Sequence, residues 1–185
     1  MKIILIRHGK TQGNLEKRYI GTTDEHLCPE GRNQISAKEY PKADLLFCSP
    51  LIRCRETAQL IYPQQQSTVI DDFRECDFGD FENKNHLELN DNTDYQAWVD
   101  SCGMLPFPNG ESRQAFSDRC CAAFSQLLQQ NYNQDIACVV HGGTIMAILE
   151  KFSTPKQDYY SYQLKNGEAY ICEYHNNNLT ILEKE

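Results

Sequence analysis

Short apolar runs rich in β-branched residues alternate with longer stretches of helical periodicity along most of the chain. Such runs predict buried strands, and they occupy residues 2–6, 44–48, 68–70, 136–140, 169–174 and 179–182. Helical patterns fall between them at 30–40, 52–62, 112–130 and 144–152. Strands that alternate with helices are typical of an α/β three-layer sandwich, in which helices flank a mostly parallel sheet.

Two segments modify this scheme. The last two strands are separated by Asn176-Asn177-Asn178, residues that tolerate left-handed backbone, so we expect an antiparallel hairpin and a mixed sheet. Residues 83–109 are polar and irregular, with a short helix expected at 94–101, and we interpret them as a short cap excursion. Because no linker or repeat interrupts the chain, residues 1–185 are expected to form a single domain.

The net charge of −8 is concentrated in residues 71–100, which carry ten acidic and two basic residues. A nucleic-acid partner is disfavoured, because phosphate backbones require clustered Lys and Arg. The first eight residues hold only four consecutive apolar residues, too few for a secretory signal, and the mean hydropathy of −0.62 is low for a membrane protein. We expect a cytoplasmic protein without a membrane partner, and the sequence leaves its oligomeric state open.

The nine cysteines show no C-x-x-C spacing, and several lie in apolar runs. We interpret them as buried thiols in a reducing compartment. Two isolated pairs, Cys172 with His175 and His26 with Cys28, lack the second half of a zinc site. The sequence therefore predicts no metal.

A histidine and glycines follow two of the predicted strands. Arg7-His8-Gly9 comes after the strand at 2–6, and His141-Gly142-Gly143 comes after the strand at 136–140 and opens a helix. Glycine lets a backbone approach a ligand, and a helix N-terminus offers free N–H groups to an anion. Since ligands of α/β sheets bind beyond the carboxyl ends of strands, we expect both histidines to serve a site for a small anion.

Five motifs resemble, in order, those of the histidine phosphatase superfamily, in its phosphoglycerate-mutase-like branch. They are Leu5-Ile6-Arg7-His8-Gly9-x-Thr11-x-x-Asn14, Ser49-Pro50-Leu51-x-Arg53, Arg74-Glu75-x-Asp77-Phe78-Gly79, Gly110-Glu111-Ser112 and Val139-Val140-His141-Gly142-Gly143. The resemblance runs from Leu5 to Gly143, which is most of the chain. It implies a phosphoglycerate-mutase-like fold and phosphoryl transfer that needs neither metal nor cofactor.

The resemblance also implies roles for individual residues. His8 corresponds to the nucleophile that forms a phosphohistidine, and an imidazole attacks only when it is unprotonated. The groups expected to hold the phosphate oxygens are Arg7, Asn14, Arg53, His141 and Gly142. The two arginines are expected to fork onto these oxygens, and His141 also counts as catalytic because it would stabilise charge during transfer.

Glu75 corresponds to the proton donor of the family. A general acid must start protonated, and like-charge neighbours raise the pKa of a carboxyl group. Because Glu75 lies in the most acidic stretch of the chain, we expect its neighbours to raise its pKa. We also expect this stretch to form an acidic rim around a basic pocket, which would favour monoesters with an uncharged organic part.

Three functions remain open from the sequence. The first is a phosphatase for a small-molecule phosphomonoester. The short segment of this chain between Glu75 and Gly110 resembles that of α-ribazole phosphatases, which act on a cobalamin precursor. Broad-specificity and sugar phosphatases share the pattern. The second is a phosphoglycerate-mutase-type phosphotransferase, for which a longer insertion is usual. The third is a non-catalytic phosphate-binding domain, which would be expected to lack one of the site residues. The intact motif set favours the phosphatase.

Overall fold

A six-stranded mixed sheet lies at the centre of the computed structural model, which describes residues 1–130 and 133–185. Within these residues the strand order is β3-β2-β4-β1-β5-β6. Strands β3, β2, β4 and β1 are parallel neighbours, whereas β5 is antiparallel to both β1 and β6. The strands are β1 (Lys2–Arg7), β2 (Leu45–Cys48), β3 (Thr68–Val69), β4 (Ile136–Val140), β5 (Ala169–His175) and β6 (Asn178–Lys184). The predicted mostly parallel, mixed sheet is confirmed.

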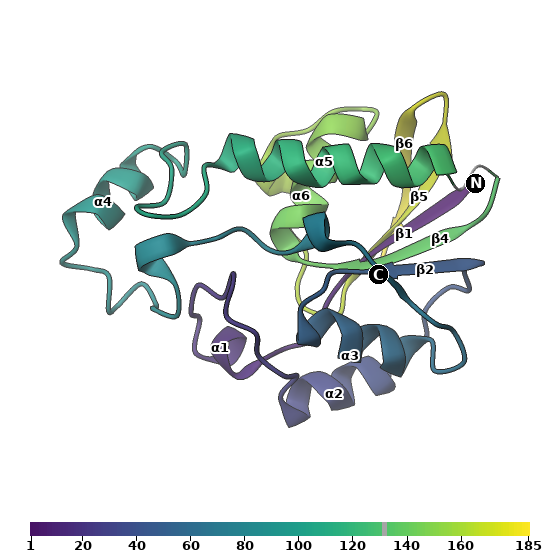
Figure 1. Ribbon diagram of the computed structural model, residues 1–185, viewed down its shortest axis with the longest axis horizontal. Helices are drawn as coiled ribbons and strands as arrows, with labels where there is room; N and C mark the ends of the chain where they lie inside the picture. The colour runs from purple at the N-terminus through teal and green to yellow at the C-terminus, as the bar shows by residue number, and fades with distance from the viewer. Residues whose placement is uncertain (131–132) are drawn as a thin grey trace.

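Helices cover both faces of this sheet (Figure 1). α5 (Arg113–Gln130) and α6 (Gly142–Phe152) lie on one face, and α2 (Pro29–Ser36) and α3 (Ile52–Ile61) lie on the other. These four helices and the three-layer arrangement were predicted. The short helix α1 (Gln12–Leu15) was not, because four residues are too few to show periodicity. It begins with a capping box, in which Thr11 accepts from the N–H of Asn14.

The alternation of side chains along β1 divides the core in two. Ile3 and Leu5 pack into the layer under α5 and α6, whereas Ile4 and Ile6 pack into the layer under α3. All four side chains are fully buried. A strand buried on both faces has a continuous apolar sequence, which explains why this segment was recognisable as a central strand.

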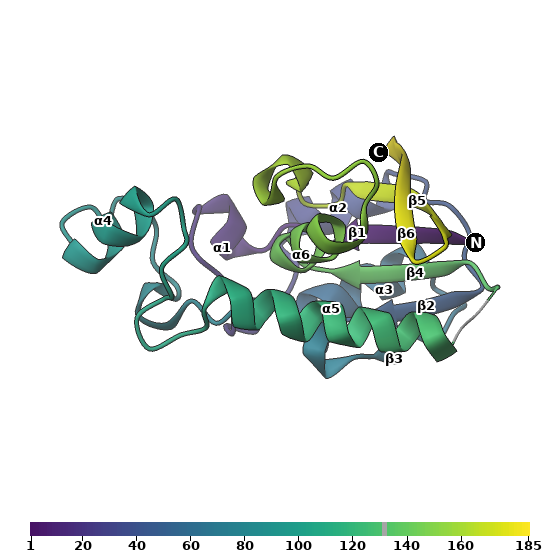
Figure 2. The same cartoon turned by 90° about the horizontal axis from the view of Figure 1, so that it is seen from above.

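Residues 83–109 extend past the carboxyl ends of the parallel strands and carry α4 (Thr93–Asp100) (Figure 2). No residue of α4 is fully buried, but Trp98 packs on Phe107 with ring centroids 5.2 Å apart and on Tyr19 at 6.0 Å. Tyr19 follows α1, so these aromatic contacts join the excursion to the segment after the first strand. They place residues 83–109 over the end of the sheet where the histidines lie.

The hairpin and the cysteines follow the sequence predictions. Asn176 and Asn177 adopt φ values of 49° and 61° in the turn between β5 and β6. All nine cysteines are free thiols, and only Cys102, in the excursion, is exposed. No helix in residues 1–130 and 133–185 has the length and apolar character needed to span a membrane.

Candidate active site

The carboxyl ends of β1 and β4 bring two histidines together. The strands are parallel neighbours with Arg7 opposite Val140, so the residues that follow them, His8 and His141, emerge side by side. Their ring centroids are 5.2 Å apart and the rings meet edge to face. A cavity of about 510 Å³ opens at this point, with His8 in its lining.

His8 is held in the form that a nucleophile requires. Its Nδ1 lies 2.7 Å from the carbonyl oxygen of Gly9, which can only accept a hydrogen bond, so the proton is on Nδ1 and the lone pair is on Nε2. The side chain is 4% exposed. Burial lowers the pKa of His8 well below its usual value, and the charges of Arg53 and Arg7 lower it further. The imidazole is therefore neutral across the physiological pH range.

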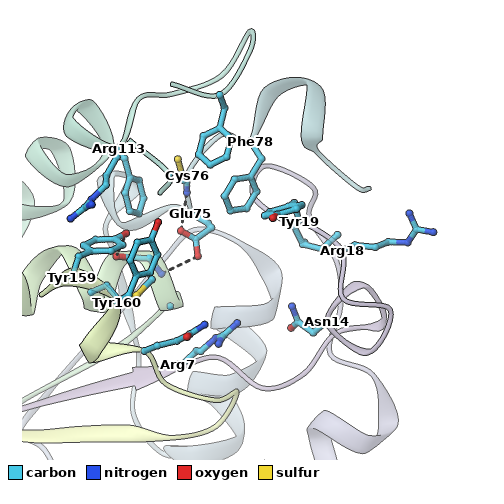
Figure 3. A pocket seen from close by; sticks show the side chains of 18 of the residues that line it. Arg7, Asn14, Arg18, Tyr19, Glu75, Cys76, Phe78, Arg113, Tyr159 and Tyr160 are labelled. Atoms are coloured by element: carbon cyan, nitrogen blue, oxygen red, sulfur yellow. Dashed lines mark hydrogen bonds between the residues drawn. The ribbon is translucent and has the colours of Figure 1, made fainter. Parts of the chain in front are cut away.

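Glu75 lies above Arg7 in the same cavity (Figure 3). Its Oε1 accepts from the backbone N–H of Cys76 at 2.9 Å, and its Oε2 accepts from that of Gly143 at 3.4 Å. Burial raises the pKa of Glu75, against the opposing effects of these hydrogen bonds and of the two arginines. The direction agrees with the sequence prediction, but the expected cause is wrong, because burial and not the acidic neighbours produces the shift.

Burial acts on these two groups in complementary ways. An isolated histidine loses its proton at a higher pH than an isolated glutamate, so the pair of neutral histidine and neutral glutamic acid is normally rare. Burial favours the uncharged form of both groups, which lowers the pKa of His8 and raises that of Glu75. Burial thus favours an unprotonated base beside a protonated acid in this cavity.

Three groups around His8 have unused hydrogen-bond donors. The buried Nε of Arg7 has no partner among the described residues, while its Nη1 donates to the carbonyl of Leu164. The amide oxygen of Asn14 accepts from Asn166 at 3.0 Å and from the N–H of Thr11 at 3.2 Å, and its NH₂ group has no hydrogen-bond partner in residues 1–130 and 133–185. Gly142 is the first residue of α6, where N–H groups lack partners within the helix. These donors suit an anion bound beside His8.

Arg53 and His141 lie next to His8 but outside the cavity lining. Arg53 is fully buried, and its two terminal nitrogens donate to backbone carbonyls of Ile20, Gly21 and Thr23, so only its buried Nε lacks a partner among the described residues. The two terminal nitrogens of Arg53, which were expected to bind phosphate oxygens, therefore already donate to the backbone of residues 20–23. His141 is bonded through Nε2 to Ser49 at 2.7 Å, and burial lowers its pKa well below the usual range.

The predicted acidic rim is wrong. The cavity lining contains one carboxylate, Glu75, whereas Lys17, Arg18 and Arg113 lie nearer its mouth. Arg18 pairs with Glu88 at 2.8 Å and Arg113 pairs with Glu150 at 2.6 Å. The other acidic residues of 71–100 are not among the residues that line it.

Several lining residues escaped the sequence motifs. Asn166 donates to the carbonyl of His8 at 3.1 Å, and Tyr159 and Tyr160 form one wall (Figure 3). They lie in the segment between α6 and β5, where the sequence shows no signal for a site. Only the pairing of β5 with β1 brings that segment to His8. No group of three or more His, Cys, Asp or Glu side chains in residues 1–130 and 133–185 is arranged to hold a metal ion.

Gly143 is required to be glycine by the position of Glu75. A Cβ at residue 143 would lie 2.5 Å from Oε1 of Glu75 and 3.0 Å from the ring of Phe116. We expect Gly143→Ala to displace the carboxyl group and to lower kcat/KM for alkyl phosphates by about 10²-fold, since small misplacements at a reacting centre have effects of that size. Steady-state kinetics measure this loss.

The melting temperature provides the control for Gly143→Ala. Alanine is the better helix former, so the substitution in α6 is expected to leave the melting temperature within a few degrees of the parent. An unchanged kcat/KM in the folded variant would contradict the placement of Glu75 against this glycine.

This arrangement can be compared with known proteins. The sequence model of the histidine phosphatase superfamily (branch 1) matches residues 3–185. The chain belongs to this superfamily. The family and the enzyme class predicted from the motifs, a phosphatase, are therefore confirmed.

Individual relatives match nearly the whole chain. The adenosylcobalamin/α-ribazole phosphatase of Escherichia coli K12 is 30% identical over 176 residues, which cover 90% of this chain and 87% of the relative. The crystal structure of the α-ribazole phosphatase from Shigella flexneri superposes with a TM-score of 0.86 at 28% identity and covers 98% and 94% of the two chains. The phosphoserine phosphatase of Entamoeba histolytica, in complex with 3-phosphoglyceric acid, gives 0.86 at 28% identity, covering 100% and 96%. These likenesses confirm the predicted fold class.

Proposed function

We propose that this superfamily member hydrolyses a small-molecule phosphomonoester through a phosphohistidine on His8, without a metal. The observation that carries the proposal is the pairing of an Nδ1-protonated, buried His8 with a buried Glu75 at one cavity. A base that is free of its proton and an acid that retains its proton are the two groups that the reaction needs. Burial shifts the pKa of each group toward the state that it needs.

The first step transfers the phosphoryl group to the protein. Nε2 of His8 attacks phosphorus, the bond from phosphorus to the ester oxygen breaks, and Glu75 gives its proton to that oxygen so that an alcohol leaves. Arg7, Asn14 and the N–H of Gly142 donate to the phosphate oxygens as charge spreads over them. The guanidinium of Arg53 adds positive charge from behind His8, and the neutral His141 packs against the His8 ring.

The second step returns the protein to its starting state. Glu75 is now ionised and takes a proton from a water molecule, whose oxygen attacks phosphorus. The bond between phosphorus and Nε2 breaks, and inorganic phosphate leaves. Each group ends with the proton that it held at the start, so the cycle needs only water and the ester.

The outer part of the cavity supports a substrate with a large uncharged organic group. The volume of about 510 Å³ far exceeds a phosphate group, and Tyr19, Trp98 and Tyr160 line its outer part. Arg18 and Arg113, the arginines near its mouth, already pair with carboxylates, so a substrate carboxylate would compete with Glu88 and Glu150. Flat aromatic groups stack on such rings. These features favour α-ribazole 5′-phosphate, the substrate class suggested by two of the relatives, over three-carbon acids.

A substrate panel tests this proposal. Inorganic phosphate release is measured from α-ribazole 5′-phosphate, phosphoserine and 3-phosphoglycerate, with EDTA present throughout. We expect EDTA to have no effect and kcat/KM to be at least about tenfold higher for the aromatic ester, the size of preference that apolar contacts supply. Isomerisation of 3-phosphoglycerate without phosphate release would support the mutase alternative instead.

A further inference from the structure

An ion pair outside the cavity binds the backbone of the segment that contains Glu75. Arg119 of α5 donates through Nε and Nη2 to the two carboxylate oxygens of Glu111, at 3.0 and 2.7 Å. Both side chains are largely buried, with 11% and 21% of their surfaces exposed. Neither residue lines the cavity, so neither is placed to touch a substrate.

The same two side chains bind the backbone on both sides of Glu75. Nη1 of Arg119 donates to the carbonyls of Asp72 at 2.8 Å and Arg74 at 3.0 Å, and Nη2 reaches that of Glu75 at 3.4 Å. Oε2 of Glu111 accepts from the N–H of Asp77 at 3.0 Å, and the N–H of Glu111 donates to the carbonyl of Asp77, also at 3.0 Å. The pair therefore holds residues 72–77 from two directions.

This segment has little regular structure of its own. Residues 74–78 belong to no helix or strand and lie between two short 3₁₀ helices, Asp71–Phe73 and Gly79–Phe81. Without a ladder of backbone hydrogen bonds, the position of Glu75 depends on its own side-chain contacts and on the side chains that hydrogen-bond to the backbone around it. Among the described residues, its own carboxyl group makes two hydrogen bonds, with the N–H groups of Cys76 and Gly143.

We propose that Arg119 and Glu111 form a positioning pair that holds the proton donor Glu75 at the cavity. This inference rests on the proposed role of Glu75 in hydrolysis. Loss of the pair frees the 72–77 backbone, and the carboxyl group then no longer reaches the leaving oxygen. The nucleophile His8 directly follows β1, which the pair does not touch, so attack at phosphorus is preserved.

A leaving-group comparison separates a positioning role from a merely structural one. The variant Arg119→Met is assayed with p-nitrophenyl phosphate, whose leaving group departs without a proton, and with glycerol 2-phosphate, whose alkoxide needs one. We expect kcat/KM to fall by about 10²-fold for the glycerol ester and to stay within about threefold for the nitrophenyl ester, since general acids contribute factors of that order. Glu111→Gln is expected to show the same selectivity.

Two controls make the result specific. Arg74→Met removes a guanidinium next to Glu75 whose contacts are exposed and long, 3.4 Å to Asp72 and 3.5 Å to the carbonyl of Asp71, and it should leave both esters unaffected. In the double variant Arg119→Met/Glu75→Gln, the glycerol ester should lose no more than in Glu75→Gln alone, because both changes remove one function. Additive losses would contradict the proposal.

Other outcomes are equally informative. Equal losses on both esters, or no loss on either, would overturn the positioning role. If Arg119→Met does not fold, Arg119→Lys is used, because lysine retains the charge and one donor nitrogen. It must then show a smaller loss with the same preference for the nitrophenyl ester over the glycerol ester. A parent protein that hydrolyses neither ester would overturn the proposed function itself, which is a different failure.

Discussion

In a His8→Ala variant, turnover of every phosphomonoester falls by at least about 10⁴-fold, because removal of a nucleophile abolishes the covalent route. His141 remains, but its Nε2 is engaged with Ser49, so we do not expect it to replace His8 as the nucleophile. The parent protein, mixed with a ³²P-labelled ester and quenched in alkali, yields a labelled protein. The variant yields none, because alkali preserves only a phosphohistidine that has formed.

His86→Ala is the matched control for this experiment. His86 is exposed, lies in the 83–109 excursion and does not line the cavity. Its replacement should leave turnover and labelling unchanged. Labelled protein in His8→Ala at the level of the parent would falsify the assignment of the nucleophile.

A Glu75→Gln variant loses activity according to the leaving group. We expect a decrease of about 10²- to 10⁴-fold for alkyl esters, the range that general acids contribute, and a much smaller one for nitrophenyl esters. Glutamine keeps the shape of the side chain, and its one amide oxygen can still accept from the N–H of Cys76 or of Gly143, so we expect the fold to be retained. Steady-state rates with the two ester types measure the difference.

The pH profile gives an independent check on Glu75. In the parent, kcat/KM for alkyl esters falls at low pH as His8 gains a proton and at high pH as Glu75 loses one. The lowered pKa of His8 moves the acid limb below the usual histidine range, and the raised pKa of Glu75 moves the alkaline limb above the usual carboxyl range. Glu75→Gln should abolish the alkaline limb and keep the acid one. An alkaline limb that persists would assign it to another group.

The framework of the fold was predictable because its central strands, β1 and β4, are buried on both faces. Residues 136–140 form an uninterrupted apolar run between polar segments, and β4 has the predicted bounds. The helix predicted at 30–40 ends earlier, at Ser36, and Ala37 is its C-cap residue. Local patterns thus located the elements, while their exact ends depended on tertiary contacts.

The chemical character of the site was predictable, but its electrostatics were not. His8 and His141 follow neighbouring strands, a relation that motifs can carry. The engagement of Arg53 by the 20–23 loop and the burial of Glu75 depend on residues distant in sequence. A single sequence contains no local signal for such contacts, so the cause of the Glu75 shift was misassigned.

The central position of β1 has a consequence for how the protein is made. This strand directly precedes the nucleophile and is synthesised before its neighbours in the sheet, β4 and β5, which lie more than 120 residues later. The carbonyl of His8 even receives its hydrogen bond from Asn166, 158 positions away. The segment Ile3–Ile6 therefore has no strand partner until β4 and β5 have been synthesised. During that time its apolar side chains can bind chaperones or aggregate. Catalytic competence then arrives late, when the segment before β5 packs against His8.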